Sequence, residues 1–134
     1  SAIELKEKQD RVEDAICATR AAIKEGIVPG GGIALLNASK VLDKKIPGEG
    51  ILRKAIKAPW KAILKNAGLE VDEPKRAGEG INVVTGNMVN MIKAGIIDPL
   101  LVTKSALKNA ASVATTILST DCVINNMRID ESGR

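Results

Sequence analysis

The sequence predicts an all-α fold that is mainly helical and contains small β pieces. Three observations support this prediction. Apolar residues recur at helical spacing in several long segments, and glycine and proline separate those segments. Phe and Tyr are absent and Trp60 is the only aromatic residue, so a core must be built from Ala, Ile, Leu and Val. A chain of 134 residues fits one domain, which buries about two thirds of its unfolded surface.

The first predicted helix covers residues 3–25. Its apolar stripe has the spacing i, i+4, i+7 and i+11, and is formed by Val12, Ile16, Thr19 and Ile23. Gly26 is expected to end this helix as a C-cap. The segment from Glu4 to Asp14 is nearly all charged and has little to bury. We therefore expect these first three turns to project from the domain or to belong to another layer.

Two further helices are predicted in the middle of the chain. Residues 33–43 form a short apolar helix, and residues 46–50 are expected to form a turn because they hold a proline and two glycines. The next helix covers residues 51–67, and Gly68 caps it. Pro59 should kink or divide this helix, because proline lacks the N–H group and its ring clashes with the preceding turn.

Residues 69–80 are expected to form a polar connection with room for one helical turn. A short helix is predicted at residues 85–94, stopped by Gly95, and residues 96–97 form a brief extended run.

The dipeptide Asp98-Pro99 predicts the start of the last helix. Asp98 would accept free amide hydrogens as the N-cap, and proline fits the first turn, where no N–H is needed. This helix should run to about Leu118 with one apolar side, formed by Val102, Ala106, Ala110, Val113 and Ile117. Residues 122–129 are β-prone.

Composition excludes several kinds of site. The chain has no His, which rules out Ser-His-Asp and Cys-His catalysis and His-containing zinc sites, and it shows no cluster of metal ligands. Cys17 and Cys122 are too few for a disulfide framework, and nothing resembles a signal peptide, so we expect reduced thiols in a cytosolic-type compartment. No apolar run approaches the ~20 residues that span a bilayer, so no membrane partner is expected.

The net charge of +4 and the pI near 9.2 raise the question of nucleic-acid binding. The basic residues are interspersed with acidic ones, and no aromatic residues are placed to stack on bases. We therefore expect no nucleic-acid partner and a mildly basic, solvated surface.

The strongest candidate site couples Asp14 to the triple glycine Gly30 to Gly32 through about three helical turns. Glycine lets the backbone approach a ligand closely. A plain interpretation is open for both features: the glycines are a flexible corner, and Asp14 is a surface carboxylate paired with Arg11. Asp98 is likewise explained by capping alone.

The sequence motifs around these residues resemble those of a known family. Val12 to Ala15 read Val-Glu-Asp-Ala, residues 26–36 contain the triple glycine, and Asn-Met-Ile-Lys-Ala-Gly-Ile-Ile-Asp-Pro begins at Asn90. In the same order follows the run from Ser105 to Val123. Together they are similar to the C-terminal half of the equatorial domain of a group I chaperonin, the GroEL type of bacteria and organelles, with part of the intermediate domain.

The resemblance implies an organisation and a set of site residues. Residues 1–13 would be an intermediate-domain segment, and residues 14–134 the C-terminal half of the equatorial ATP-binding domain, a partial helical bundle. Asp14 matches the carboxylate that orients or activates the attacking water. The nucleotide contacts carried over from the family are Gly31, Asn82, Val83, Ile96 and Asp98.

The sequence also departs from the family pattern. The family usually carries an aromatic-Gly-aromatic stretch before the asparagine, where this chain has Gly-Glu-Gly-Ile at residues 78–81. Neither the phosphate-gripping Gly-Asp-Gly-Thr-Thr word nor the threonine-glycine loop of the N-terminal half occurs, so these residues would form one wall of an ATP site. The chain alone is therefore expected to be inactive and to bind nucleotide at best in the millimolar range.

For the longer parent, the resemblance implies an ATPase and folding isomerase. It would use ATP or ADP with Mg²⁺ and assemble into a double ring that encloses non-native proteins beneath a co-chaperonin lid. It would lie in the cytoplasm or an organellar matrix. Residues 122–129 would help to join subunits, and the chain alone is expected to self-associate. The alternative is a helical structural or interaction module, or a divergent paralogue, without an ATPase role.

Overall fold

The computed structural model describes residues 1–125. Within them the prediction of a mainly helical fold with small β pieces is confirmed. The order of elements is α1 (Ala2–Glu25), β1 (Ile27–Pro29), α2 (Ile33–Ser39), α3 (Pro47–Ala55), α4 (Ala58–Asn66), β2 (Glu79–Asn82), β3 (Asn87–Asn90), β4 (Ile97–Pro99) and α5 (Leu100–Leu118). None of the helices in this part of the chain is long and apolar enough to cross a bilayer.

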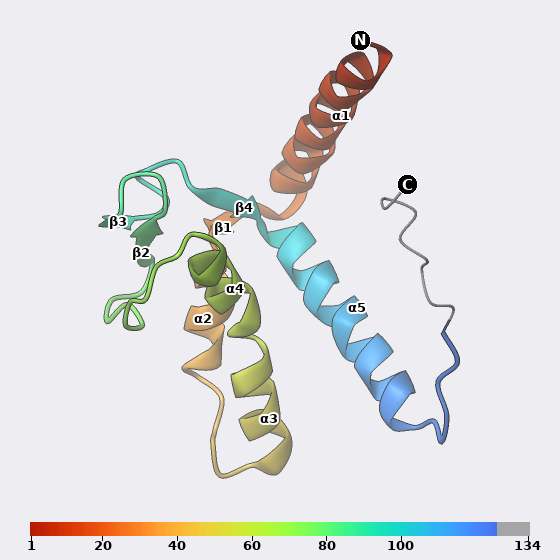
Figure 1. Cartoon of the computed structure of the whole chain (residues 1–134). Helices are drawn as coiled ribbons and strands as arrows, with labels where there is room; N and C mark the ends of the chain where they lie inside the picture. Colours follow the sequence, from red (N-terminus) through yellow and green to blue (C-terminus); the bar gives the residue numbers. More distant parts are fainter. Residues whose placement is uncertain (126–134) are drawn as a thin grey trace.

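Two antiparallel strand pairs organise the helices. β1 pairs with β4, with Val28 opposite Asp98, and so joins the end of α1 to the start of α5. β2 pairs with β3 as a hairpin. In Figure 1, α1 projects from the β1–β4 pair in one direction and α5 leaves it in another, while α2, α3 and α4 lie together as a separate group.

The core lies between α2, α4 and the hairpin region. It is small and consists of Ile33, Leu36, Trp60, Leu64 and Met91. Partly buried apolar residues pack against it: Leu69, Ile81, Val89 and Ile96. The single aromatic side chain, Trp60, is therefore central, as an otherwise aliphatic composition requires.

Helix α1 matches the predicted element closely. Ser1 and Glu4 form a capping box at its start, and Gly26 follows its last residue with φ of 82°. Only Ala21 is buried on the whole helix, so the predicted apolar stripe is left largely open to solvent. The expectation that the first three turns bury little is confirmed.

The middle helices differ from the prediction in their bounds. The helix expected at 33–43 ends at Ser39, because Asp43 forms a local turn: its Oδ1 accepts from the Lys45 amide at 2.9 Å. The predicted turn at 46–50 is wrong, because Pro47 opens α3 at the first helical position, where proline is tolerated. The division near Pro59 is confirmed, since α3 ends at Ala55 and α4 begins at Ala58.

The helix predicted at residues 85–94 is wrong, because this segment supplies β3 and the hairpin turn. The Asn82 side chain accepts from the Val84 amide at 3.0 Å, and the Gly86 amide donates to the Asn82 carbonyl at 2.7 Å. Gly86 has φ of 73°, which only glycine adopts without strain. Turn chemistry therefore overrides the helical spacing. The connection at 69–78 contains no helix.

The end of the chain carries little regular structure in the described part. Residues 122–125 follow α5 without pairing to any strand, and the remaining part of the β-prone run, 126–129, lies outside the described residues. Helix α5 has the predicted extent but no buried residue. Val102, Val113 and Ile117 remain half exposed or more, and an open groove of about 560 Å³ separates α5 from α3 and α4.

The junction between the glycine turn and α4 makes a first prediction. A Cβ on Gly32 would lie 2.7 Å from the Trp60 backbone nitrogen, and Gly32 has φ of 76°. Gly32→Ala should therefore lower the free energy of unfolding by at least about 2 kcal/mol, from left-handed strain and a backbone clash. Gly48→Ala is the control, because a Cβ there meets nothing within 4 Å, and alanine should raise stability by up to about 1 kcal/mol. Urea denaturation measures both, and equal midpoints for the two variants would contradict this packing.

Candidate functional site

The glycine turn is tightly packed on three sides. The Gly30 amide donates to the Ile96 carbonyl at 2.9 Å, and a Cβ on Gly30 would lie 3.1 Å from the Ile96 backbone. A Cβ on Gly31 would lie 2.9 Å from Met91 Cε, and Gly32 meets Trp60. The interpretation of these glycines as a flexible corner is therefore wrong. They allow β4, the end of the hairpin and α4 to meet at one turn.

Asp98 lies beside this turn but does not cap α5. Its backbone is paired with Val28 in the strand ladder, Pro99 is the N-cap residue, and no side chain caps the helix. The amide of Leu100, which a cap would serve, donates instead to the Gly26 carbonyl at 3.0 Å. The predicted capping role is therefore wrong, because strand pairing satisfies the start of the helix.

The Asp98 carboxylate is thus left without an assigned structural role. Among residues 1–125 it makes no hydrogen bond or ion pair. Its side chain still reaches solvent, but partial desolvation by the surrounding protein raises the pKa of the Asp98 carboxyl above its ordinary value. A carboxylate without a hydrogen-bond donor in the described residues is available to accept from a hydroxyl or amide of a bound molecule.

Asn82 and Val83 lie at the far end of β2. The Asn82 Oδ1 atom is engaged by the Val84 amide, whereas Val83 is 43% exposed. The hairpin is fixed to the glycine turn through Gly80, where a Cβ would lie 2.7 Å from the Ile33 side chain. Strand pairing and the Gly30–Ile96 hydrogen bond therefore hold one group of predicted residues at the same junction: Gly31, Ile96 and Asp98. The hairpin that carries Asn82 and Val83 packs against this junction through Gly80 and Ile33.

Asp14 lies apart from this group. It is exposed on α1, twelve residues before Gly26, which is about 18 Å along a helix axis. The pair with Arg11 that offered a plain explanation is absent from the ion pairs of the described residues. Nothing in this part of the chain holds the Asp14 carboxylate in place.

One feature escaped the sequence analysis. The basic side chains of α3 and α4 gather in one cleft, and residues 50–69 contain no acidic residue. The only sequence signal is the spacing of Lys54, Lys57 and Lys61 by three and four residues, which is hidden by the break near Pro59. Within residues 1–125 no group of three or more His, Cys, Asp or Glu side chains is placed to hold a metal ion.

Asp98 is exposed, but the surrounding protein desolvates its carboxyl enough to raise the pKa, and this predicts a pH-dependent effect of Asp98→Asn. A raised pKa in the folded state means that the fold disfavours the charged form, so the carboxylate lowers stability above that pKa. This cost disappears below the unfolded-state pKa of about 3.9. Asp98→Asn should therefore stabilise the chain at pH 7 and leave it unchanged near pH 3, as measured by urea midpoints. A difference of the same size at both pH values would contradict the desolvation of this carboxylate.

The chain is similar in sequence and in structure to known proteins. The family model described as the TCP-1/cpn60 chaperonin family matches residues 1–128. A crystal structure of a group III chaperonin in the open state superposes with a TM-score of 0.69 at 28% sequence identity. The match covers 78% of this chain and 25% of the group III chain, so this chain corresponds to about a quarter of that protein. With nearly its whole length matched by the family model, the chain belongs to the TCP-1/cpn60 chaperonin family.

Proposed function

We propose that this chain is the C-terminal half of the equatorial, ATP-binding domain of a chaperonin, preceded by a strut from the intermediate domain. The strut is residues 1–13 and the equatorial part is residues 14–134. The match to a quarter of the group III chain supports a piece of this size. The projection of α1 away from the other helices supports its separate role (Figure 1). The sequence motifs around Asp14 and Asp98 favour a group I parent of the GroEL type.

One observation carries the proposal of nucleotide binding. The Gly30 amide bonds to the Ile96 carbonyl, and Val28 pairs with Asp98, so the closely packed glycine turn and the Asp98 carboxylate, which has no partner among residues 1–125, belong to the same strand junction. In the proposed site the Gly31 backbone faces the phosphates, and the Asp98 carboxylate accepts from the ribose hydroxyls. Ile96 covers one face of the base.

The hairpin supplies the edge of the proposed base site. Asn82 has its Oδ1 atom engaged in the turn, so its side-chain NH₂ remains as a donor. Val83 is partly exposed beside it and offers an apolar contact. Gly78 to Ile81 carries no aromatic side chain, so the base would be held by aliphatic contact and hydrogen bonds rather than by stacking.

Asp14 is proposed to orient or activate the water that attacks the terminal phosphate of ATP. Its exposed position on α1, without an ion pair in the described residues, leaves the carboxylate available for this role. Residues that neutralise the phosphates and hold Mg²⁺ would come from the N-terminal half of the domain. The chain alone is therefore proposed to lack ATPase activity.

The open surfaces of the chain are consistent with a piece of a larger assembly. The groove of about 560 Å³ between α3, α4 and α5 is lined almost wholly by Ala, Leu, Ile and Pro side chains. We propose that the parent covers such surfaces within its domain and in its ring. There it would act as an ATP-dependent chaperonin, in the cytoplasm or an organellar matrix, enclosing non-native proteins under a co-chaperonin lid.

The same open groove favours the alternative, a helical interaction module without ATPase activity. Such a module would bind a partner through α5 whether or not Asp14 and Asp98 are intact. Nucleotide turnover separates the two functions.

The test is Asp14→Ala in the full-length parent, with Glu13→Ala as the matched control. Removing the carboxylate should slow ATP turnover by roughly 10² to 10⁴-fold and leave ATP affinity nearly intact, because the residue acts on water rather than on nucleotide. Glu13→Ala removes the same charge from the adjacent position of α1 and should leave turnover within about twofold. Steady-state turnover and equilibrium ATP binding measure the two effects. Equal turnover of wild type and Asp14→Ala would return Asp14 to the status of a surface charge.

A further inference from the structure

A basic cleft of about 680 Å³ opens on the side of α3 and α4, apart from the glycine turn. The basic cleft is lined by residues from the loop before α3, from both helices and from the connection after α4. These residues are Lys44, Pro47, Gly50, Ile51, Arg53, Lys54, Lys57, Lys61 and Glu73. None of them belongs to the proposed nucleotide site, and none is aromatic.

The basic cleft holds the net charge of the chain. Its lining contains five cationic side chains and one carboxylate, which gives a formal charge of +4. The whole chain also has a net charge of +4, so the charges of all other residues cancel. The mildly basic surface expected from the sequence therefore has its excess positive charge in one place. Four of the five cations come from residues 53–61, and folding adds Lys44 from the loop before α3 and Glu73 from the connection after α4.

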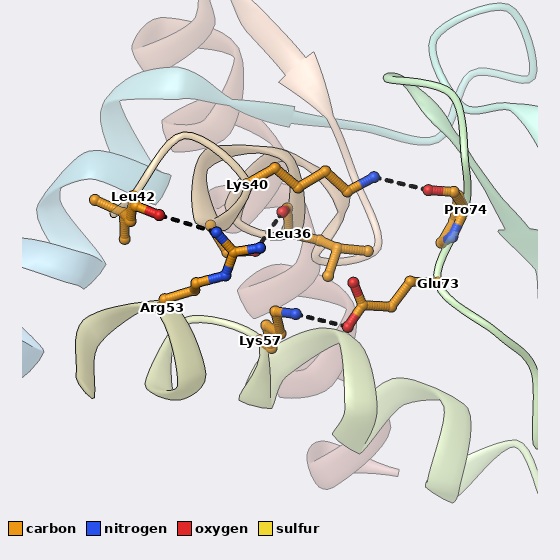
Figure 2. A network of polar contacts seen from close by, with 8 residues as sticks. Leu36, Lys40, Leu42, Arg53, Lys57, Glu73 and Pro74 are labelled. Atoms are coloured by element: carbon orange, nitrogen blue, oxygen red, sulfur yellow. Dashed lines mark hydrogen bonds and ion pairs between the residues drawn. The ribbon is translucent and has the colours of Figure 1, made fainter. Parts of the chain in front are cut away.

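Hydrogen bonds fix the walls of the cleft, as Figure 2 shows. Arg53 donates to the Leu42 carbonyl at 2.9 Å and so attaches the loop to α3. Lys57 donates to Glu73 at 2.7 Å and attaches the connection to the start of α4. Outside the lining, Lys40 donates to the Pro74 carbonyl at 2.7 Å and attaches the same connection to the end of α2. These bonds hold the loop and the connection against α3 and α4, so the backbone around the open cleft is fixed.

Three of the lining cations have no such task. Among residues 1–125, the side chains of Lys44, Lys54 and Lys61 make no hydrogen bond or ion pair. The only carboxylate in the lining, Glu73, is already paired with Lys57, and its pKa is lowered by that hydrogen bond and further by the charges of Lys57, Lys40 and Lys61. The ammonium groups that line one cleft repel each other, so a bound anion would reduce this repulsion.

We propose that the basic cleft is a binding site for a compact polyvalent anion of the oligophosphate class. Lys44, Lys54 and Lys61 supply the contacts, since the lysine ammonium is a compact charge that binds phosphate groups. The volume suits a small molecule. The lining has no aromatic side chain on which a base could stack, so the phosphate groups alone would be recognised. Pro47, Gly50 and Ile51 form an uncharged floor.

The test uses inorganic tripolyphosphate, without Mg²⁺, titrated into the 134-residue chain by calorimetry at low salt. Saturable binding with a stoichiometry near one is expected, and it should weaken when the salt is raised, as charge-driven contacts do. Lys54→Glu with Lys61→Glu should weaken binding at least tenfold. The matched control is Lys93→Glu with Lys108→Glu, which makes the same change in net charge at exposed positions outside the cleft and should weaken binding less than threefold.

Two outcomes would overturn the proposal: binding that does not saturate, or an equal loss in the control pair, which would show a response to net charge alone. Circular dichroism checks that both pairs keep the helical fold. If the charge reversal unfolds the chain, Lys54→Gln with Lys61→Gln replaces it, and a loss of at least threefold is then required. Because Asp14, Gly31 and Asp98 are intact in every variant, failure here leaves the nucleotide proposal untouched.

Discussion

The close approach of backbone to backbone at Gly30 to Gly32 is the constraint on which the rest of the structure depends. Gly30 donates to the Ile96 carbonyl, and Gly32 leaves no room for a Cβ against Trp60. One turn therefore fixes α2 against α4 and fixes β4 next to β1. The core around Trp60 forms on one side of this turn, and α1 and α5 diverge from the other (Figure 1).

This constraint also decides what the candidate site can be. Strand pairing at the junction satisfies the backbone at the start of α5, and the Asp98 side chain is consequently not needed as a cap. The glycines, in contrast, are fully explained by packing, so their presence alone carries no evidence for a ligand. The unused carboxylate beside them is the feature that favours binding. The family match then gives that feature a context as part of a chaperonin.

The sequence was sufficient for the long elements and insufficient for the short ones. Helices α1 and α5 were predicted because their spacing is sustained over many turns, and the break near Pro59 followed from the missing N–H group. The hairpin at β2 and β3 was missed because four-residue strands carry little periodic signal and depend on the Asn82 turn. Pro47 was misjudged because the first position of a helix accepts a proline.

The candidate site divides in the same way. Its residues were predicted from motifs shared with the family. The arrangement of Gly31, Ile96 and Asp98 depends on the register of β1 and β4, which no local sequence pattern predicts. Four of the five cations of the basic cleft lie within residues 53–61. The complete lining also needs Lys44 and Glu73 from two other segments, and their approach could not be predicted from the sequence. Exposure of the apolar side of α5 was expected from the family resemblance rather than from the periodicity, because periodicity predicts an apolar face but not whether this chain covers it.

Native-state hydrogen exchange of the Gly30 amide tests the central constraint most directly. If its bond to the Ile96 carbonyl joins the parts of the fold, this amide should exchange only with global unfolding. Its opening free energy should then equal that of the Leu36 amide, which bonds to the Gly32 carbonyl at 3.0 Å beside the core. Exchange of the Gly30 amide as fast as that of Val84 in the exposed hairpin turn would show that the glycine turn opens locally and does not hold the structure together.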